Sequence, residues 1–187
     1  MLFLRFFIMD NLAMYLFDLT QNSISAHAKT IACTMTEYPD QLDIIMSDDG
    51  CGMDENALKH ATSPFYTTRK TRSVGLGLPL IKWLCEKTEG SFEITSEMNK
   101  GTTLNFTLKN NHVDMPPLGD LGEMIVLIAQ VKEVDQYIFT YQKGSKSFIF
   151  DLKVYQELLK ETLYQFDVME YLKGYIVQEI NIVREKE

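Results

Sequence analysis

A glycine-rich turn that directly follows a strand-like segment constrains this chain more than any other feature. Residues 42–47 have the composition of a strand, which Asp48-Asp49-Gly50-Cys51-Gly52 then ends. Two glycines allow the backbone to turn tightly and to approach a flat ligand closely. An aspartate at the end of a strand can accept a hydrogen bond from an exocyclic amine such as N6 of adenine. The alternatives are a simple Asp-Gly turn or a calcium loop, but the sequence lacks the acidic alternation and final Glu of an EF-hand.

The apolar spacing on both sides of this turn predicts a mixture of helices and strands. Residues 11–26 have apolar side chains at helical spacing, whereas residues 31–36 alternate between two faces. We predict helices at 11–26, after Asp54 and from Leu78 to Gly90, and strands at 31–36, 42–47, 91–96 and 102–109. This order predicts an α+β sandwich with the helices on one face of the sheet.

A second group of elements follows a stretch that contains two adjacent prolines. We interpret residues 1–9 as an apolar N-terminal arm, 10–110 as the main domain, 111–119 as a linker and 120–187 as a small C-terminal α+β extension. The extension is predicted to contain a helix at 121–131, a hairpin at 135–142 and 146–151, and a mostly helical end at 154–187. It is either a module for partner binding or dimerisation, or a part that completes the core of the main domain.

Composition and charge narrow the possible functions. The chain has 18 Lys and Arg residues against 26 Asp and Glu residues, and its net charge of −8 argues against binding to a nucleic-acid backbone. No apolar stretch reaches transmembrane length, so we expect no membrane binding. The three cysteines, Cys33, Cys51 and Cys85, show no CxxC spacing, which favours a reducing compartment and predicts a cytoplasmic protein.

Asp18 and Asn22 lie four positions apart in the first predicted helix. This spacing puts both side chains on the same helix face, one turn apart. The amide oxygen of Asn is a hard, neutral ligand that suits Mg²⁺. A carboxylate one turn earlier can accept a proton from a water molecule that attacks a phosphate. The alternative for such a pair is an ordinary solvated polar face.

Gly75-Leu76-Gly77-Leu78-Pro79 precedes the third predicted helix. Backbone N–H groups at a helix N-terminus stabilise phosphate oxygens through their partial positive charge. The segment 63–74 before it is polar and without periodicity, which predicts a loop. Its cations Arg69, Lys70 and Arg72 either reach the β- or γ-phosphate or are solvated charges.

The order of these motifs resembles that of the gyrase, chaperone, histidine-kinase and MutL (GHKL) superfamily of ATPases. Residues 18–26 look like its N box, and residues 48–53 look like its G1 box. Ser-Pro-Phe-Tyr-Thr-Thr at 63–68 and Gly-Leu-Gly-Leu-Pro-Leu at 75–80 are most similar to the F and G2 boxes of histidine kinases, and Lys-Gly-Thr-Thr at 100–103 is similar to the last box. The resemblance covers about residues 10–109 and implies a Bergerat-type α/β sandwich with a mixed sheet.

The resemblance implies that the chain binds ATP together with Mg²⁺. Asn22 would then be the Mg²⁺ ligand and Asp18 the catalytic carboxylate, while the loop 63–74 would be a lid over ATP. The ATP-binding residues that the motifs imply are Asn22, Asp48, Gly50, Gly52, Met53, Thr67, Thr68, Lys70, Gly75, Leu76, Gly77, Leu78 and Thr102.

The sequence departs from the histidine-kinase pattern in two ways. The N box normally has Glu at the position of Asp18, and the shorter side chain predicts slow ATP hydrolysis. The three histidines, His27, His60 and His112, stand in none of the phospho-acceptor contexts, so we interpret them as structural or surface residues. We therefore predict phosphotransfer to a partner protein in trans. The alternative is an ATP-dependent switch that binds a protein without kinase activity, and a homodimer is among the open oligomeric states.

Overall fold

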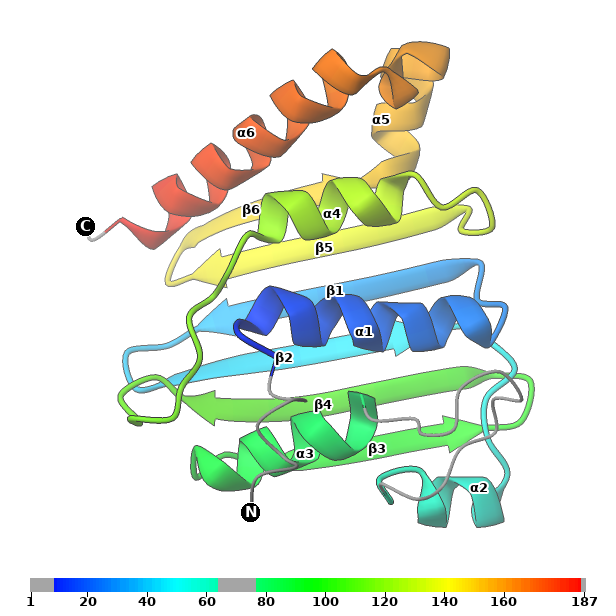
Figure 1. Cartoon of the computed structure of the whole chain (residues 1–187), viewed down its shortest axis with the longest axis vertical. Helices are drawn as coiled ribbons and strands as arrows, with labels where there is room; N and C mark the ends of the chain where they lie inside the picture. Colours follow the sequence, from blue (N-terminus) through cyan, green and yellow to red (C-terminus); the bar gives the residue numbers. More distant parts are fainter. Residues whose placement is uncertain (1–8, 64–76, 186–187) are drawn as a thin grey trace.

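The computed structural model describes residues 9–63 and 77–185, and its strands form one six-stranded sheet (Figure 1). The strands are β1 (Thr30–Glu37), β2 (Gln41–Asp48), β3 (Phe92–Glu97), β4 (Gly101–Lys109), β5 (Gln136–Lys143) and β6 (Lys146–Asp151). Their order across the sheet is β3-β4-β2-β1-β5-β6. Strands β1 and β5 are parallel, and every other neighbouring pair is antiparallel. The sheet is therefore mixed, as the sequence predicts.

The helices cover one face of this sheet. They are α1 (Leu12–Ser25), α2 (Glu55–His60), α3 (Gly77–Lys87), α4 (Leu121–Ala129), α5 (Leu152–Leu159) and α6 (Phe166–Arg184), with the short 3₁₀ helix η2 (Lys160–Tyr164) between the last two. Helices α1, α3 and α4 lie in front of the sheet in Figure 1, and α6 packs against α4, β5 and β6. The predicted α+β class is thus confirmed. None of the helices in the two described ranges combines the length and the apolar character that a membrane span needs.

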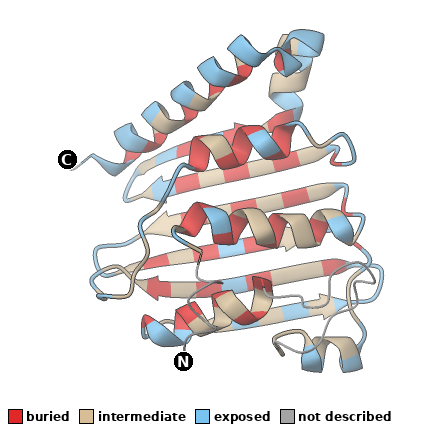
Figure 2. Ribbon diagram, viewed as in Figure 1, coloured by how far each residue is buried: buried red, intermediate tan, exposed pale blue. Residues whose placement is uncertain are grey.

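Buried residues alternate with less buried ones along the strands (Figure 2). Because successive side chains of a strand point to opposite faces, one sheet face is buried and the other is partly open. In β1, the side chains of Ile31, Cys33 and Met35 are at most 1% exposed. In β5, Tyr137 and Phe139 lie beside the first two of these residues and are fully buried. Each large apolar side chain buried in this way stabilises the fold by about 1.5–3 kcal/mol. The core therefore runs between the sheet and the helix layer.

Strands β5 and β6 come from the segment that the sequence assigns to a C-terminal extension. In the parallel register, Thr30 lies beside Gln136 and Glu37 lies beside Lys143. The buried apolar side chains of this segment belong to the same hydrophobic cluster as those of the first four strands. In the described chain, the extension thus shares both a sheet and a core with the part that precedes it.

The segment 111–119 connects β4 to α4 and lies against the start of α1. The first two N–H groups of α1 donate to carbonyl oxygens of this segment, in the pairs Leu12–Pro117 at 2.9 Å and Ala13–Leu118 at 3.0 Å. The side chain of Asn11 caps the same turn. First-turn N–H groups have no partner within their own helix, so these contacts satisfy donors that would otherwise need water.

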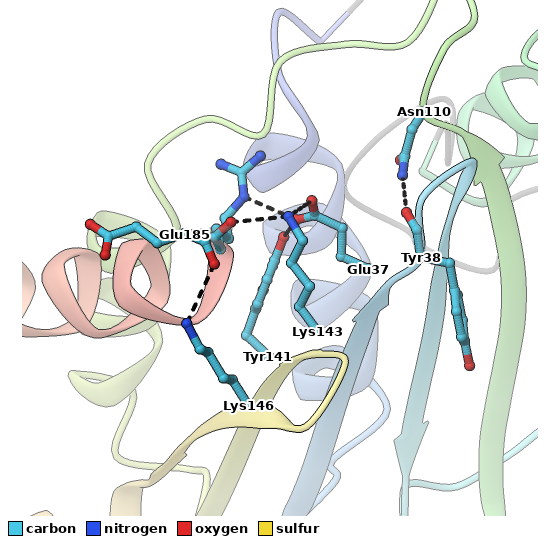
Figure 3. A network of polar contacts seen from close by, with 8 residues as sticks. Glu37, Tyr38, Asn110, Tyr141, Lys143, Lys146 and Glu185 are labelled. Atoms are coloured by element: carbon cyan, nitrogen blue, oxygen red, sulfur yellow. Dashed lines mark hydrogen bonds and ion pairs between the residues drawn. The ribbon is translucent and has the colours of Figure 1, made fainter. Parts of the chain in front are cut away.

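Glu37 at the end of β1 fastens the end of α6 to the sheet (Figure 3). Its carboxylate accepts hydrogen bonds from Lys143 Nζ at 2.7 Å, from Arg184 Nε at 3.0 Å and from the Tyr141 hydroxyl. Burial alone would raise the pKa of Glu37, but these three donors outweigh it and hold the pKa below its ordinary value. Burial and the neighbouring Glu37 raise the pKa of Tyr141, so this hydroxyl remains a protonated donor.

Candidate functional site

Helix α1 places Asp18 and Asn22 beside the first residue of α3. The apolar side chains on the other side of α1, such as Leu16 and Leu19, are buried against the sheet and fix the helix in place. A Cβ atom added to Gly77 would lie 2.3 Å from Asp18 Oδ2 and 3.1 Å from Asn22 Nδ2. Because position 77 is a glycine, the N-terminus of α3 can approach both polar side chains. Residues from two separate sequence motifs therefore meet here.

The carboxylate of Asp48 is held in a fixed orientation at the end of β2. Ser23 Oγ donates to Asp48 Oδ2 at 2.6 Å, and the backbone N–H of Gly50 donates to Asp48 Oδ1 at 2.9 Å. Each carboxylate oxygen still has a further lone pair that can accept a hydrogen bond from a ligand. Ser23 follows Asn22 directly, so one turn of α1 carries the candidate metal ligand and the residue that orients Asp48.

The turn after Asp48 is packed onto the C-terminal end of α1. The N–H of Cys51 donates to the carbonyl oxygen of Ala26 at 2.8 Å. A Cβ atom on Gly50 would come within 2.9 Å of both the side chain and the carbonyl oxygen of Ala26. The first glycine of the motif is therefore needed for this close packing of the turn onto the helix.

Two further glycines allow the same turn to contact the β3–β4 hairpin. Gly52 has φ +62° and Gly101 has φ +100°, a region that favours glycine. A Cβ atom on Gly52 would lie 2.0 Å from the carbonyl oxygen of Glu97, and one on Gly101 would lie 1.8 Å from the carbonyl oxygen of Asp48. Thr102 lies beside Asp48 in the β2–β4 register. The structure thus brings the G1-like motif and the Gly-Thr turn into direct contact.

Ser96 connects this corner, although the sequence motifs do not include it. Its hydroxyl accepts from the N–H of Met53 at 2.9 Å and donates to the carbonyl oxygen of Gly101 at 2.8 Å. The hydroxyl of Thr102 lies 3.0 Å away. A serine within a predicted strand has no local pattern that marks it as functional, and only the register of β3 with β4 shows its position.

Asp49, the second acid of the Asp-Asp pair, has a structural role. Its Oδ1 accepts hydrogen bonds from the N–H groups of Lys29 at 2.7 Å and Thr30 at 2.9 Å, which fixes the start of β1. Burial tends to raise the pKa of Asp49, but the N–H donors of Thr30 and Lys29 outweigh it and lower the pKa. Of the two acids, Asp48 is therefore the one that lies in the corner with Thr102 and Met53.

The remaining predicted ATP-binding residues either pack in the core or lie outside the described part of the chain. Leu78 is partly buried in α3 and packs against the hydrophobic core. The predicted ATP-binding residues Thr67, Thr68, Lys70, Gly75 and Leu76, together with most of the predicted lid at 63–74, lie outside the described residues.

The donor set near Gly77 fits a metal that is shared with a bound phosphate. Residues 9–63 and 77–185 contain no group of three or more His, Cys, Asp and Glu side chains that could hold a metal ion. The polar side chains at Gly77 are one carboxylate, Asp18, and one amide, Asn22. Magnesium in nucleotide sites is commonly bound by few protein oxygens together with phosphate oxygens, and this pair suits such a site.

Comparison with known proteins gives a family match over the part that contains this site. The model of the histidine kinase-, DNA gyrase B- and HSP90-like ATPases matches residues 9–112. Sporulation kinase E of Bacillus subtilis is 42% identical over 69 residues, which are 37% of this chain and 9% of that protein. Sensor histidine kinase ZraS of Escherichia coli is 30% identical over 112 residues, which are 59% of this chain and 24% of that protein. The chain thus spans less than a quarter of the length of these relatives.

Solved structures are also similar to this chain. The catalytic domain of histidine kinase ThkA is 25% identical, with a TM-score of 0.42 over 51% of this chain and 64% of that one. The N-terminal domain of a DNA repair protein is 17% identical, with a TM-score of 0.51 over 76% of this chain and 52% of that one. The second similarity concerns the fold alone.

Proposed function

Because the chain belongs to the histidine kinase-, DNA gyrase B- and HSP90-like ATPase family, we propose that it binds ATP with Mg²⁺ and transfers the γ-phosphate to a partner protein in trans. Hydrolysis of ATP without that partner is slow. The observation that carries this proposal is the close approach of Gly77 to both Asp18 and Asn22. It puts a helix N-terminus, a candidate metal ligand and a candidate proton acceptor at one place.

At the adenine end, Asp48 would accept a hydrogen bond from N6. Ser23 and the N–H of Gly50 keep its carboxylate oriented before the ligand arrives, which supports this role. A guanine base has a carbonyl oxygen at the equivalent position, so it would face the carboxylate without a donor. Thr102 and Met53 lie in the same corner and complete the proposed adenine site.

At the phosphate end, the N-terminus of α3 would contact the β- and γ-phosphates through its backbone N–H groups. Gly77 leaves room for this approach, because any side chain there would collide with Asp18. Asn22 would hold Mg²⁺, which neutralises phosphate charge when it is bound. Lys70, Thr67 and Thr68 are proposed to contact the phosphates from the lid, as the family resemblance implies.

Asp18 would accept the proton of the attacking group. It lies one helical turn from Asn22 and touches the space next to Gly77, so it is close to the proposed position of the γ-phosphate. Its side chain is one methylene shorter than the Glu of the family pattern. Alignment of the attacking group contributes much of the rate in phosphoryl transfer, so the shorter reach supports slow hydrolysis of ATP by water.

The positions of the histidines support an acceptor on another protein. His27 is exposed and has φ +61° in the turn after α1, and His60 is exposed at the end of α2. His112 accepts a hydrogen bond at Nδ1 from the N–H of Asp114 at 3.1 Å, within the connection to α4. The free thiols of Cys33, Cys51 and Cys85 support a reducing compartment, and we place the protein in the cytoplasm.

The test is transfer of label from γ-labelled ATP, measured with and without proteins of the source cell. We expect label on another protein, sensitive to acid, and little release of phosphate by the purified chain alone. Asp18→Ala should abolish the transfer and leave ATP affinity nearly unchanged, since the group acts in the transition state. Asp10→Ala, an exposed acid before α1, is the matched control. Label on His27, His60 or His112 would overturn transfer in trans.

The second candidate is an ATP-dependent conformational switch without kinase activity. One observation favours it: the carbonyl oxygens of Pro117 and Leu118 cap the helix that carries Asp18 and Asn22. A shift of α1 on nucleotide binding would therefore move the connection to the C-terminal segment. Hydrogen exchange at residues 113–119 that changes with ATP, without label transfer to any protein, would support the switch over the kinase.

A further inference from the structure

We propose that a groove between α1 and α4 is the docking site for a partner protein, through a helical segment with apolar residues flanked by Lys or Arg. The proposal rests on the proposed phosphotransfer, because the groove shares Asp18 with the proposed phosphate site. The groove has a volume of about 380 Å³. It involves α4, which lies outside the part of the chain that the family model matches.

The walls of the groove are largely apolar, and two of their side chains are well exposed. Among the described residues, its apolar lining consists of Met9, Ala13, Met14, Phe17, Met124 and Leu127. Met14 is 47% exposed and Leu127 is 42% exposed, on two helices whose opposite faces are buried in the core. Contiguous exposed apolar side chains of this kind mark interaction surfaces. Methionine adapts its shape to different partners, which suits a docking site for side chains rather than for a rigid small molecule.

Most of the polar side chains that line the groove are acidic, which favours an occupant with positive charge. The acidic residues are Asp18, Asp120 and Glu123. Lys173 of α6 pairs with Asp120 at 3.5 Å and with Glu123 at 2.5 Å, so one cation is shared by two of these carboxylates. The chain as a whole has a net charge of −8. A segment with Lys or Arg beside its apolar residues would therefore be attracted to the groove and oriented by it.

The shape of the groove favours a helix. Helices α1 and α4 contact each other side by side on the same sheet face (Figure 1). Two neighbouring helices leave a valley into which a third helix can place side chains at helical spacing. The 9 residues of α4 extend over about 13 Å at 1.5 Å per residue, a length that two to three turns of a partner helix would match.

The position of Asp18 connects docking to chemistry. This carboxylate lines the groove and also lies 2.3 Å from the site of a Cβ atom on Gly77. A helix that occupies the groove would therefore bring its own acceptor side chain next to the proposed proton acceptor and the N-terminus of α3. The groove is thus the place where the phospho-acceptor protein is recognised.

The experiment uses a fluorescein-labelled 18-residue peptide of Leu and Lys, with Leu at helical spacing on one face, and the full chain. Fluorescence anisotropy gives the affinity. We expect Met14→Glu and Leu127→Glu each to weaken binding at least tenfold. The control is Leu158→Glu, which replaces a 72% exposed leucine on α5 and should bind as the wild type does. All three variants add one negative charge, so general attraction of a basic peptide cannot explain a difference between them.

Two outcomes would overturn the docking site. The first is equal binding of the peptide to all variants, or equal binding of a peptide with the same composition and its Leu residues scattered. The second is tighter binding to a chain that starts at Met9, with competition by a peptide of residues 1–8, which would assign the groove to this chain's own N-terminal segment. Calorimetry with ATP separates the proposals: intact ATP binding with either outcome removes only the docking site, whereas absent ATP binding removes the proposed function itself.

Discussion

Ser23 in α1 donates a 2.6 Å hydrogen bond to the carboxylate of Asp48 in β2, across 25 positions of sequence. We expect Ser23→Ala to weaken ATP binding by about threefold to tenfold, because the carboxylate loses the donor that orients it. Asp48→Asn should weaken binding by about tenfold or more, since it removes the acceptor itself. Calorimetry measures both affinities, and Ser25→Ala at the exposed end of α1 is the control. Wild-type affinity in Ser23→Ala would show that orientation of Asp48 is not required.

Gly77→Ala should destabilise the protein through a clash with Asp18. The added Cβ would lie 2.3 Å from Asp18 Oδ2, so the carboxylate has to move, at a cost of about 1–3 kcal/mol. In an Asp18→Ala background the clash is absent, and the cost should fall by at least about 0.5 kcal/mol in urea unfolding. Gly174→Ala is the control: apart from the adjacent backbone of α6 and the two neighbouring residues, no described atom lies within 4 Å of its Cβ, and the change should stabilise α6 by about 0.5–1 kcal/mol. Additive effects of Gly77→Ala and Asp18→Ala would contradict the contact.

Asn22→Ala should remove the dependence of ATP affinity on Mg²⁺. The amide group of Asn22 lies beside Gly77, and its oxygen is the proposed neutral ligand of Mg²⁺. Without that oxygen the ion would lose this protein ligand. Titration with ATP in Mg²⁺ and in EDTA should give two affinities for the wild type and one for the variant. Asn105→Ala, at an exposed position of β4, should behave as the wild type. An equal effect of EDTA on wild type and Asn22→Ala would remove the proposed role.

Glu37→Gln should destabilise the protein near neutral pH and have little effect in acid. The three donors around Glu37 lower its pKa from the ordinary value of 4.5, so the ionised form is favoured in the folded state. The resulting stability is present above that ordinary value and is lost as pH falls through the lower pKa of the folded protein. We expect a loss of about 1–3 kcal/mol at pH 7, since a partly buried charged acceptor is replaced.

Urea unfolding of wild type and Glu37→Gln between pH 7 and pH 3 measures this dependence. The difference in unfolding free energy should shrink as the pH falls below about 4.5. Glu93→Gln, at an exposed position of β3, should show no such difference at either end of the range. A difference that is constant with pH would mean that the network acts through packing and not through charge.

Two tyrosines of β5 should respond in opposite ways to removal of their hydroxyl groups. The Tyr137 hydroxyl is fully buried and has no hydrogen bond of ordinary geometry among the described residues, although the Thr20 side chain offsets part of the rise in its pKa on burial. Tyr137→Phe should therefore be neutral or stabilising. Tyr141→Phe should cost about 1–2 kcal/mol, because Glu37 then loses a donor. Thermal unfolding of both variants gives the comparison, and a large loss for Tyr137→Phe would reveal a partner for its hydroxyl.

The sequence predicts the elements, and it marks the motifs of the candidate site, because these signals are local. Apolar residues at helical spacing predict the helix that becomes α1, and alternation predicts β1 and β2. The sequence predicts a helix that begins near Asp54, and the Asp54 side chain caps α2 by accepting from the N–H of Ala57 at 2.7 Å. The glycines around Asp48 are predicted to let the backbone turn tightly and approach a flat ligand. The tight packing is present, since a Cβ atom on Gly50 would come within 2.9 Å of Ala26, whereas the approach to a ligand stays a prediction.

Other features could not be predicted because they depend on contacts between distant segments. The alternation of residues 136–143 predicts a strand, but it does not indicate that this strand pairs with β1 in parallel. Ser23 lies within the N-box-like residues 18–26, but its bond to Asp48 depends on how α1 packs against the end of β2. Ser96 belongs to no motif, and its hydroxyl reaches Met53 and Gly101 only because β3 and β4 are in register. The groove between α1 and α4 likewise depends on how two helices are placed on the sheet.

The pairing of β1 with β5 also bears on how the chain is synthesised and purified. Glu37 at the end of β1 pairs with Lys143, which lies 106 positions later in the chain. During translation, one edge of β1 therefore stays unpaired until the end of β5 has left the ribosome. A gene fragment cut at residue 112, where the family match stops, would keep that edge open permanently. The unpaired N–H and C=O groups of an exposed strand edge can form hydrogen bonds with the strands of other chains. Such a fragment should therefore accumulate as aggregates, whereas expression through α6 should give monodisperse protein.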